Sequence, residues 1–166
     1  FSTANQRFER AKDSLPTNVA YVEVVLKHSN VNGTTGRVVL TGFGDNYIGN
    51  VTFKFSDQSI CFHTGVGSGA DYNTAYVWDF DTNIHTFNSL GYLDGTLVDN
   101  EDFVTSGASW QYTYPALGNY RSNTGVKNEN QFYGEIYSIR LYSRVLTSEE
   151  MARNHASDVS RFGLGA

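Results

Sequence analysis

The sequence predicts an all-β domain: an antiparallel jelly-roll β-sandwich with one short C-terminal helix. First, short runs rich in β-branched and aromatic residues recur at steady intervals, separated by Gly, Asn, Asp or Ser, which is typical of strands joined by turns. Second, the one clear helical pattern comes at the end of the chain, whereas βαβ proteins alternate helices with strands. Third, aromatic residues make up 14% of the chain and charged residues 17%, a composition that favours a packed β-rich domain over disorder.

The chain divides into a polar lead-in segment, 1–17, and the sandwich domain, 18–166. In the lead-in we expect a short turn of helix around Arg7 to Lys12. Nine runs with strand character follow, at 20–28, 36–43, 50–57, 59–65, 74–81, 84–90, 91–98, 109–118 and 132–144. Asp94-Gly95 predicts a two-residue type I′ hairpin turn, because both central positions of that turn need positive φ.

Alternation within the runs indicates which side chains share a face of the predicted sheets. Phe53 and Phe55 alternate with Lys54 and Ser56. We therefore expect one face of that strand to pack in the core and the other to face solvent. Another run places three rings on one face: Trp110, Tyr112 and Tyr114. This face is either part of the inner core or an exposed aromatic platform, and the sequence leaves both interpretations open.

The last helix has strong local signals at both ends. Thr147 and Glu150 form a capping box, in which each side chain bonds the other residue's amide. Leu146 and Met151 occupy the two positions of a hydrophobic staple, and Gly163 is a natural stop. We expect one apolar stripe to dock the helix on the sandwich, formed by Met151, His155, Val159 and Phe162.

This C-terminal segment resembles a known signature. Its matching positions are Phe132, Gly134, Ile136, Ile139, Arg140, Leu141, Tyr142, Leu146, Thr147, Glu149, Glu150, Asn154, Asp158, Arg161 and Phe162. They are similar to the C-terminal pattern of laminin-G-like, concanavalin A-like domains in bacterial surface and phage structural proteins. Upstream, His85 and Asp94-Gly95 also fit, while Ile84 stands where that family commonly has Trp.

The resemblance implies a non-catalytic attachment module, extracellular, on a bacterial surface or a virion. Such a module recognises a glycan or glycoprotein receptor. The alternative is a structural or assembly domain of a phage virion or surface protein that mediates subunit contacts as a homo-oligomer.

Sugar binding needs rings that stack on the sugar and short polar groups that bond its hydroxyls. Predicted loops bring both together, and the candidate ligand-binding residues are Asp45, Asn46, Tyr47, Tyr72, Asn73, Tyr120 and Arg121. The ordinary explanation for any single one is that Asn and Tyr populate turns in a Tyr-rich protein.

Metal binding has weaker support in the sequence. Loop carboxylates and amides are oxygen ligands that Ca²⁺ accepts, and Asp99 and Asp102 are the candidates for a calcium site. Their spacing is not that of a recognisable calcium loop, so calcium stays an alternative and no cofactor is required. The four histidines are dispersed, which gives no support to a zinc site.

Enzymatic and nucleic-acid-binding functions are not expected. Glucan-cleaving jelly-roll enzymes carry paired acidic residues on one strand face. Here Asp79 and Asp81 share a face, but no Glu accompanies them, and the strand glutamates Glu23 and Glu135 lie far apart in the sequence. The net charge of −5 with scattered basic residues argues against nucleic acid. No run of 18 apolar residues exists, so no membrane insertion is expected.

Overall fold

The structure is a computed structural model that describes part of the chain. The described residues are 8–9, 21–28, 37–41, 50–54, 59–63, 74–77, 83–97, 116–118, 120–122, 125–127, 132 and 134–164. Side chains are described for 21–27, 83–97, 117–118, 132 and 134–164. The other strand residues contribute their backbone and register.

One sheet has six antiparallel strands in the order β1-β10-β3-β4-β5-β6. Its strands are β1 (Phe8–Glu9), β10 (Ala116–Leu117), β3 (Arg37–Thr41), β4 (Asn50–Lys54), β5 (Ser59–His63) and β6 (Thr74–Val77). The backbone of β1 pairs with β10, with Phe8 opposite Leu117. The helical turn predicted around Arg7 to Lys12 is therefore wrong at Phe8–Glu9, where pairing with a distant strand overrides the local pattern.

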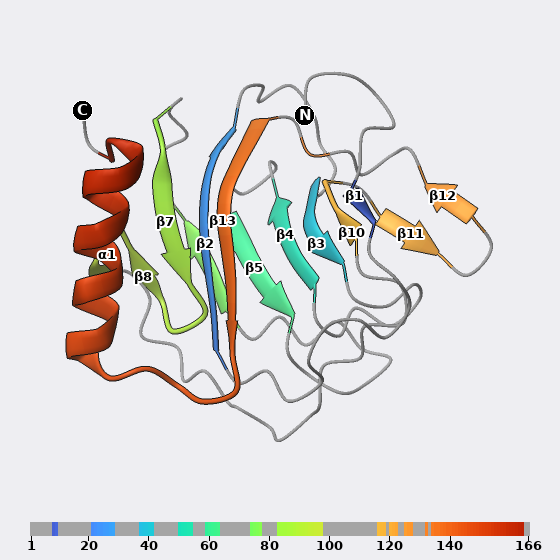
Figure 1. The fold of residues 1–166 in the computed structure, drawn as a ribbon. Coiled ribbons are helices and arrows are strands. Elements are labelled where there is room, and N and C mark those ends of the chain that lie inside the picture. The colour runs from blue at the N-terminus through green and yellow to red at the C-terminus, as the bar shows by residue number, and fades with distance from the viewer. Residues whose placement is uncertain are drawn as a thin grey trace.

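The second sheet has five antiparallel strands in the order β13-β2-β7-β8-β9. They are β13 (Gly134–Tyr142), β2 (Tyr21–His28), β7 (His85–Asn88), β8 (Tyr92–Leu93) and β9 (Thr96–Leu97). A separate two-stranded ribbon joins β11 (Tyr120–Ser122) to β12 (Gly125–Lys127). The five-stranded sheet lies between helix α1 (Ser148–Phe162) and the six-stranded sheet (Figure 1). The predicted antiparallel all-β fold with a C-terminal helix is confirmed at this level.

Strand β2 is buried on both faces. Residues 21–26 are all at most 3% exposed, because β2 is hydrogen-bonded between β13 and β7 and covered on both sides. Side chains alternate along a strand, so Val22, Val24 and Leu26 share one face. Glu23 is on the opposite face, where it contacts Asn154 of α1. A charged side chain is thus buried beneath the helix.

The predicted ends of α1 are confirmed. Glu150 N donates to Thr147 Oγ1 at 3.3 Å, and Thr147 N donates to Glu150 Oε2 at 2.9 Å, which completes the capping box. Gly163 ends the helix at φ 70°, and its amide donates to Val159 O at 3.0 Å. Because φ is positive there, glycine suits this position.

The predicted docking stripe of α1 is wrong at one position. Val159 is 40% exposed, while its neighbour Asp158 is 1% exposed. Asp158 is buried because Arg140 on β13 donates to both of its carboxylate oxygens. This ionic contact fixes the rotation of the helix about its axis, and hydrophobic periodicity alone does not report it.

Candidate functional site

The β8–β9 hairpin is held against β7 by Asp94. Asp94 and Gly95 have φ of 47° and 78°, as the predicted type I′ turn requires. The Asp94 carboxylate accepts from Thr86 N at 2.8 Å and lies 2.7 Å from His85 Nδ1. Its own amide donates to Thr86 O at 2.9 Å. The turn is therefore tied to β7 through backbone and side chain together.

Gly95 allows α1 to approach this turn closely. A Cβ atom built on Gly95 would lie 2.9 Å from Cδ2 of His155, a contact shorter than carbon atoms tolerate. The absence of a side chain therefore lets the His155 ring lie directly against the backbone of the turn. This contact sets the spacing between helix and hairpin at one end of a pocket.

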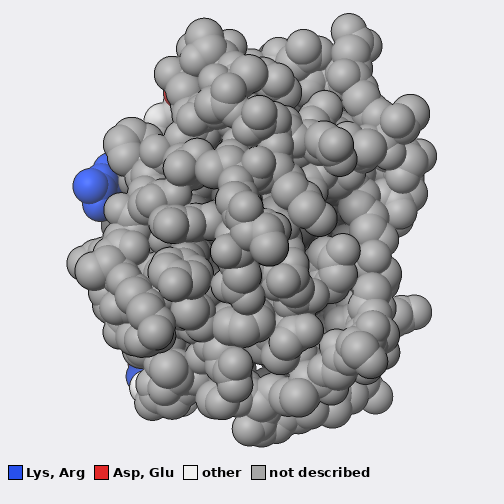
Figure 2. Space-filling view, turned by 90° about the vertical axis from the view of Figure 1, so that its right-hand side faces the viewer, with Lys and Arg blue, Asp and Glu red and all other residues white. Residues whose placement is uncertain are grey.

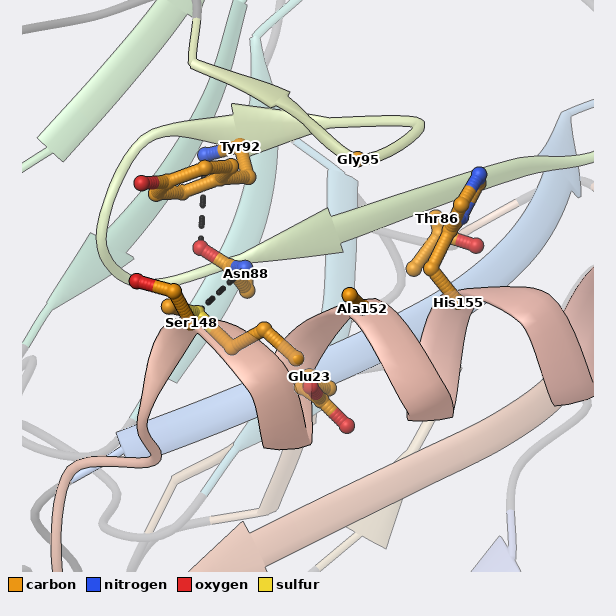
Figure 3. Close-up of a pocket in the computed structure, with 9 residues that line it drawn as sticks. Glu23, Thr86, Asn88, Tyr92, Gly95, Ser148, Ala152 and His155 are labelled. Atoms are coloured by element: carbon orange, nitrogen blue, oxygen red, sulfur yellow. Dashed lines mark hydrogen bonds between the residues drawn. The ribbon is translucent and has the colours of Figure 1, made fainter.

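The pocket lies between α1 and the β7–β9 segment and has a volume of about 190 Å³. On the sheet side it is lined by Thr86, Asn88, Tyr92 and Gly95. On the helix side it is lined by Ser148, Met151, Ala152 and His155. Glu23 of β2 completes the lining. Tyr92, Asn88 and Ser148 lie at one end, and Thr86, Gly95 and His155 at the other (Figure 3).

Glu23 is held by four donors from three parts of the chain. Its Oε1 atom accepts from the Tyr21 hydroxyl at 3.0 Å. Its Oε2 atom accepts from Asn154 Nδ2 at 2.8 Å, Arg140 Nη1 at 3.0 Å and the Tyr142 hydroxyl at 3.2 Å. A buried carboxylate is stable when it is paired and fully hydrogen-bonded. Glu23 is therefore an anchor of the fold at the edge of the pocket.

Arg140 connects Glu23 to the helix. Its guanidinium donates to Asp158 through both terminal nitrogens, with Nη1 to Oδ2 at 2.9 Å. The hydrogen bonds to Asp158, followed by those to Glu23, raise the pKa of Arg140 above its usual range despite partial burial. Burial and then the nearby Glu23 charge raise the pKa of Tyr142. Arg140 therefore stays charged between the two carboxylates that it contacts.

Two buried polar atoms in the pocket lining have no hydrogen-bond partner in the part of the chain that the structure describes. They are Oγ1 of Thr86 and Nδ1 of His155. Thr86 is only 8% exposed. Leaving a buried donor or acceptor unsatisfied costs about 1–3 kcal/mol. Both atoms lie within the packing at the end of the pocket beside the hairpin turn and have almost no accessible surface.

Most residues predicted from sequence to form the site lie outside the described residues. These are Asp45, Asn46, Tyr47, Tyr72, Asn73, Asp99 and Asp102. Tyr120 and Arg121 were expected in a loop, but their backbone forms β11, which pairs with β12; their side chains are outside the described set. Figure 2 faces the side of the molecule opposite α1, and nearly all of that surface belongs to residues that are not described.

The pocket could not be found from the sequence, because its residues come from separate segments. Glu23, between valines in "YVEVV", is the one signal that was available, since a charge inside an apolar strand needs a partner. His155 was expected to pack against the sheet, and it does contact the hairpin. Thr86 carries no local signal, because threonine is ordinary in strands.

Neither a metal-binding cluster nor a membrane-spanning helix occurs in the described part of the chain. No group of three or more His, Cys, Asp or Glu side chains is placed there to hold a metal ion. Within the same residues, no helix has the length and apolar character needed to cross a membrane. The calcium site predicted at Asp99 and Asp102 stays a prediction.

Comparison with known proteins relates the fold to receptor-binding domains of botulinum neurotoxins. No protein-family model matches the chain, and no curated protein matches it by sequence. Among solved structures, a mutant of the domain HCR/D superposes with a TM-score of 0.65 at 12% identity, covering 96% of this chain and 42% of that one. The serotype D ligand-binding domain in complex with N-acetylneuraminic acid gives 0.61 at 11% identity, with the same coverage.

A third similar solved structure is also a binding domain of a botulinum neurotoxin. The binding domain of botulinum neurotoxin DC in complex with rat synaptotagmin II gives a TM-score of 0.52 at 9% identity, covering 91% of this chain and 42% of that one. The chain thus spans less than half the length of these structures. At such identities the likeness is one of fold. The resemblance to laminin-G-like domains stays a prediction from the terminal signature.

Proposed function

We propose that this chain is a non-catalytic, extracellular attachment module with a jelly-roll sandwich, which recognises a glycan or glycoprotein receptor on a cell surface. The observation that carries the proposal is the fold likeness, across 96% of the chain, to a ligand-binding domain solved with N-acetylneuraminic acid. A second structurally similar binding domain was solved in complex with synaptotagmin II, so a domain of this fold also binds a protein. A bacterial surface or a virion is the setting that the terminal signature favours.

The chemistry of the pocket also favours binding over cleavage. Glycosidases use two carboxyl groups, roughly 5–9.5 Å apart, one of which acts as an acid or nucleophile. Among the described residues that line the pocket, Glu23 is the sole carboxylate. It is held by Arg140 and three further donors. The pair of carboxyl groups that a glycosidase uses is therefore not found among these lining residues.

A direct test is binding of the purified full chain to a glycan array and to cultured cells. The cells are compared with and without prior enzymatic removal of surface glycans. We expect saturable binding that falls when glycans are removed. A folded chain that binds neither array nor cells contradicts the proposal. A stable oligomer by light scattering with the same negative result supports the alternative, an assembly domain.

A further inference from the structure

We propose that Met151 is a site of oxidative modification. Hydrogen peroxide reaches its sulfur through the pocket between α1 and the β8–β9 hairpin, and the methionine sulfoxide that forms is retained in the folded protein by the side-chain amide of Asn88. Such a site goes beyond the proposed receptor-binding function and does not depend on it, because it requires only the pocket and a peroxide.

The side chain of Met151 is only partly buried, although it stands in the first turn of a docked helix. It lines the pocket, which has a volume of about 190 Å³. Three other lining residues, Gly95, Ser148 and Ala152, are exposed, so the pocket opens to solvent. One water occupies roughly 30 Å³ of liquid. Hydrogen peroxide, with two oxygen atoms, is therefore small enough to enter.

The Asn88 amide group is oriented toward the sulfur. Its Oδ1 atom accepts from Leu90 N at 3.0 Å and from Tyr92 N at 3.3 Å (Figure 3). Only the oxygen of an amide side chain accepts such bonds, so these two contacts fix which end of Asn88 faces the helix. Nδ2 donates to Met151 Sδ at 3.7 Å. A thioether sulfur is a weak acceptor, so this donor is poorly used before oxidation.

Oxidation gives the Asn88 donor a stronger acceptor. The sulfur lone pair attacks one oxygen of the peroxide, so that an S–O bond forms while the O–O bond breaks, and the second oxygen leaves as water after proton transfer. The sulfur loses two electrons and the peroxide gains them. An N–H···O hydrogen bond spans about 2.9 Å. An oxygen bonded to the sulfur can therefore accept from Nδ2 while the sulfur stays near its present 3.7 Å from that atom.

The pocket decides what the oxidation does to the fold. Sulfoxide formation disrupts a closed core, because the side chain becomes polar and the new oxygen is buried without a partner. At Met151 the oxygen gains both the Asn88 donor and the open volume of the pocket. Helix α1 should therefore stay docked after oxidation, with one polar atom added to the helix side of the pocket.

The first test measures whether the sulfur reacts in the folded state. The full chain is treated with hydrogen peroxide at several urea concentrations below its unfolding transition. Peptide mass spectrometry quantifies the gain of one oxygen at Met151, the one methionine in the chain, with Met151→Leu as the control. We expect a rate that hardly changes with urea. A rate that rises steeply with urea overturns the proposal, because the free energy of unfolding falls linearly with urea concentration.

Asn88→Asp tests the retaining contact, because it keeps an oxygen for the two turn amides and removes the donor. Oxidation should raise the unfolding equilibrium constant about three- to tenfold more in this variant than in wild type, the effect of one hydrogen bond. Asn83→Asp is the matched control, since Asn83 is exposed and does not line the pocket. An equal effect of oxidation in wild type and both variants overturns the role of Asn88.

A measurement on wild type alone covers the case in which Asn88→Asp does not fold. In ¹⁵N-labelled protein, complete oxidation of Met151 should move the side-chain amide proton signals of Asn88 downfield, because the amide then donates to an oxygen instead of a thioether sulfur. Unchanged Asn88 signals in an oxidised, folded chain overturn the retaining contact. Unfolding of wild type on oxidation overturns it as well.

Discussion

Arg140 Nη1 donates to Asp158 Oδ2 at 2.9 Å, and this contact joins the long strand β13 to the C-terminal helix. The same nitrogen donates to Glu23 on β2 at 3.0 Å. One guanidinium therefore ties together two adjacent strands and the helix that covers them. Asp158 and Glu23 are 1% and 3% exposed, so the cluster is positioned to decide whether α1 stays docked.

Arg140→Met should destabilise the fold strongly. The variant leaves two buried carboxylates without their cation, and breaking a buried pair costs about 3–5 kcal/mol. Because the Arg140 side chain keeps 25% of its exposure, we expect the lower end, about 3 kcal/mol, measured by urea unfolding. Arg144→Met is the control, since Arg144 is 61% exposed in its pair with Glu150. Equal losses in the two variants would contradict this role.

Tyr142→Phe should have a smaller but clear effect. The Tyr142 hydroxyl accepts from Asn154 at 2.9 Å and donates to Glu23 at 3.2 Å, so its removal weakens the link between β13 and α1. We expect a loss of about 1–2 kcal/mol in the free energy of unfolding. Tyr137→Phe is the matched control, because its hydroxyl bonds Glu135 on the exposed surface. A larger loss of unfolding free energy in Tyr137→Phe than in Tyr142→Phe would contradict the prediction.

The pair between Arg144 and Glu150 should make helix docking sensitive to acid. The hydrogen bond from Arg144, and then the Thr147 amide, lower the pKa of Glu150 from 4.5 to about 2. A carboxyl whose pKa is lower in the folded state stabilises that state above the unfolded value. Its contribution is complete above pH 4.5 and disappears as the pH falls toward 2.

Glu150→Gln should therefore lower the urea midpoint at pH 7, with a difference from wild type that narrows between pH 4.5 and 3. The exposed pair is screened by salt, so the difference should also shrink at high ionic strength. In an Arg144→Gln background, Glu150→Gln should have a smaller effect, as a double-mutant cycle reports. A difference that stays constant with pH would contradict the assignment.

Gly95→Ala and Gly163→Ala separate backbone strain from close packing. Both glycines have positive φ, 78° and 70°, which an alanine adopts at a cost of about 1 kcal/mol. A Cβ at Gly163 meets nothing within 4 Å, whereas one at Gly95 lies 2.9 Å from His155. We expect Gly95→Ala to cost at least about 1 kcal/mol more, by thermal or urea unfolding. Similar losses would show that His155 moves away freely.

The local features of the fold could be predicted from sequence. Each of the nine predicted strand runs contains a strand, and the Asp94-Gly95 turn and the Thr147–Glu150 capping box are where the pattern placed them. These features depend on residues a few positions apart, whose side chains bond neighbouring backbone or alternate between two faces. Such interactions are encoded within a short window of sequence.

The tertiary structure alone decided where charge is buried and where a pocket forms. Glu23 and Arg140 are 117 positions apart and meet only because β2 and β13 pair with Glu23 opposite Arg140. The contact of Arg140 with Asp158 rotates α1 so that Val159 faces solvent, against the hydrophobic period. The pocket depends on that rotation and on Gly95, which has no side chain and so leaves room for the His155 ring. Paired charge is costly to bury unless several distant segments converge on it, so its position follows from packing and not from any local pattern.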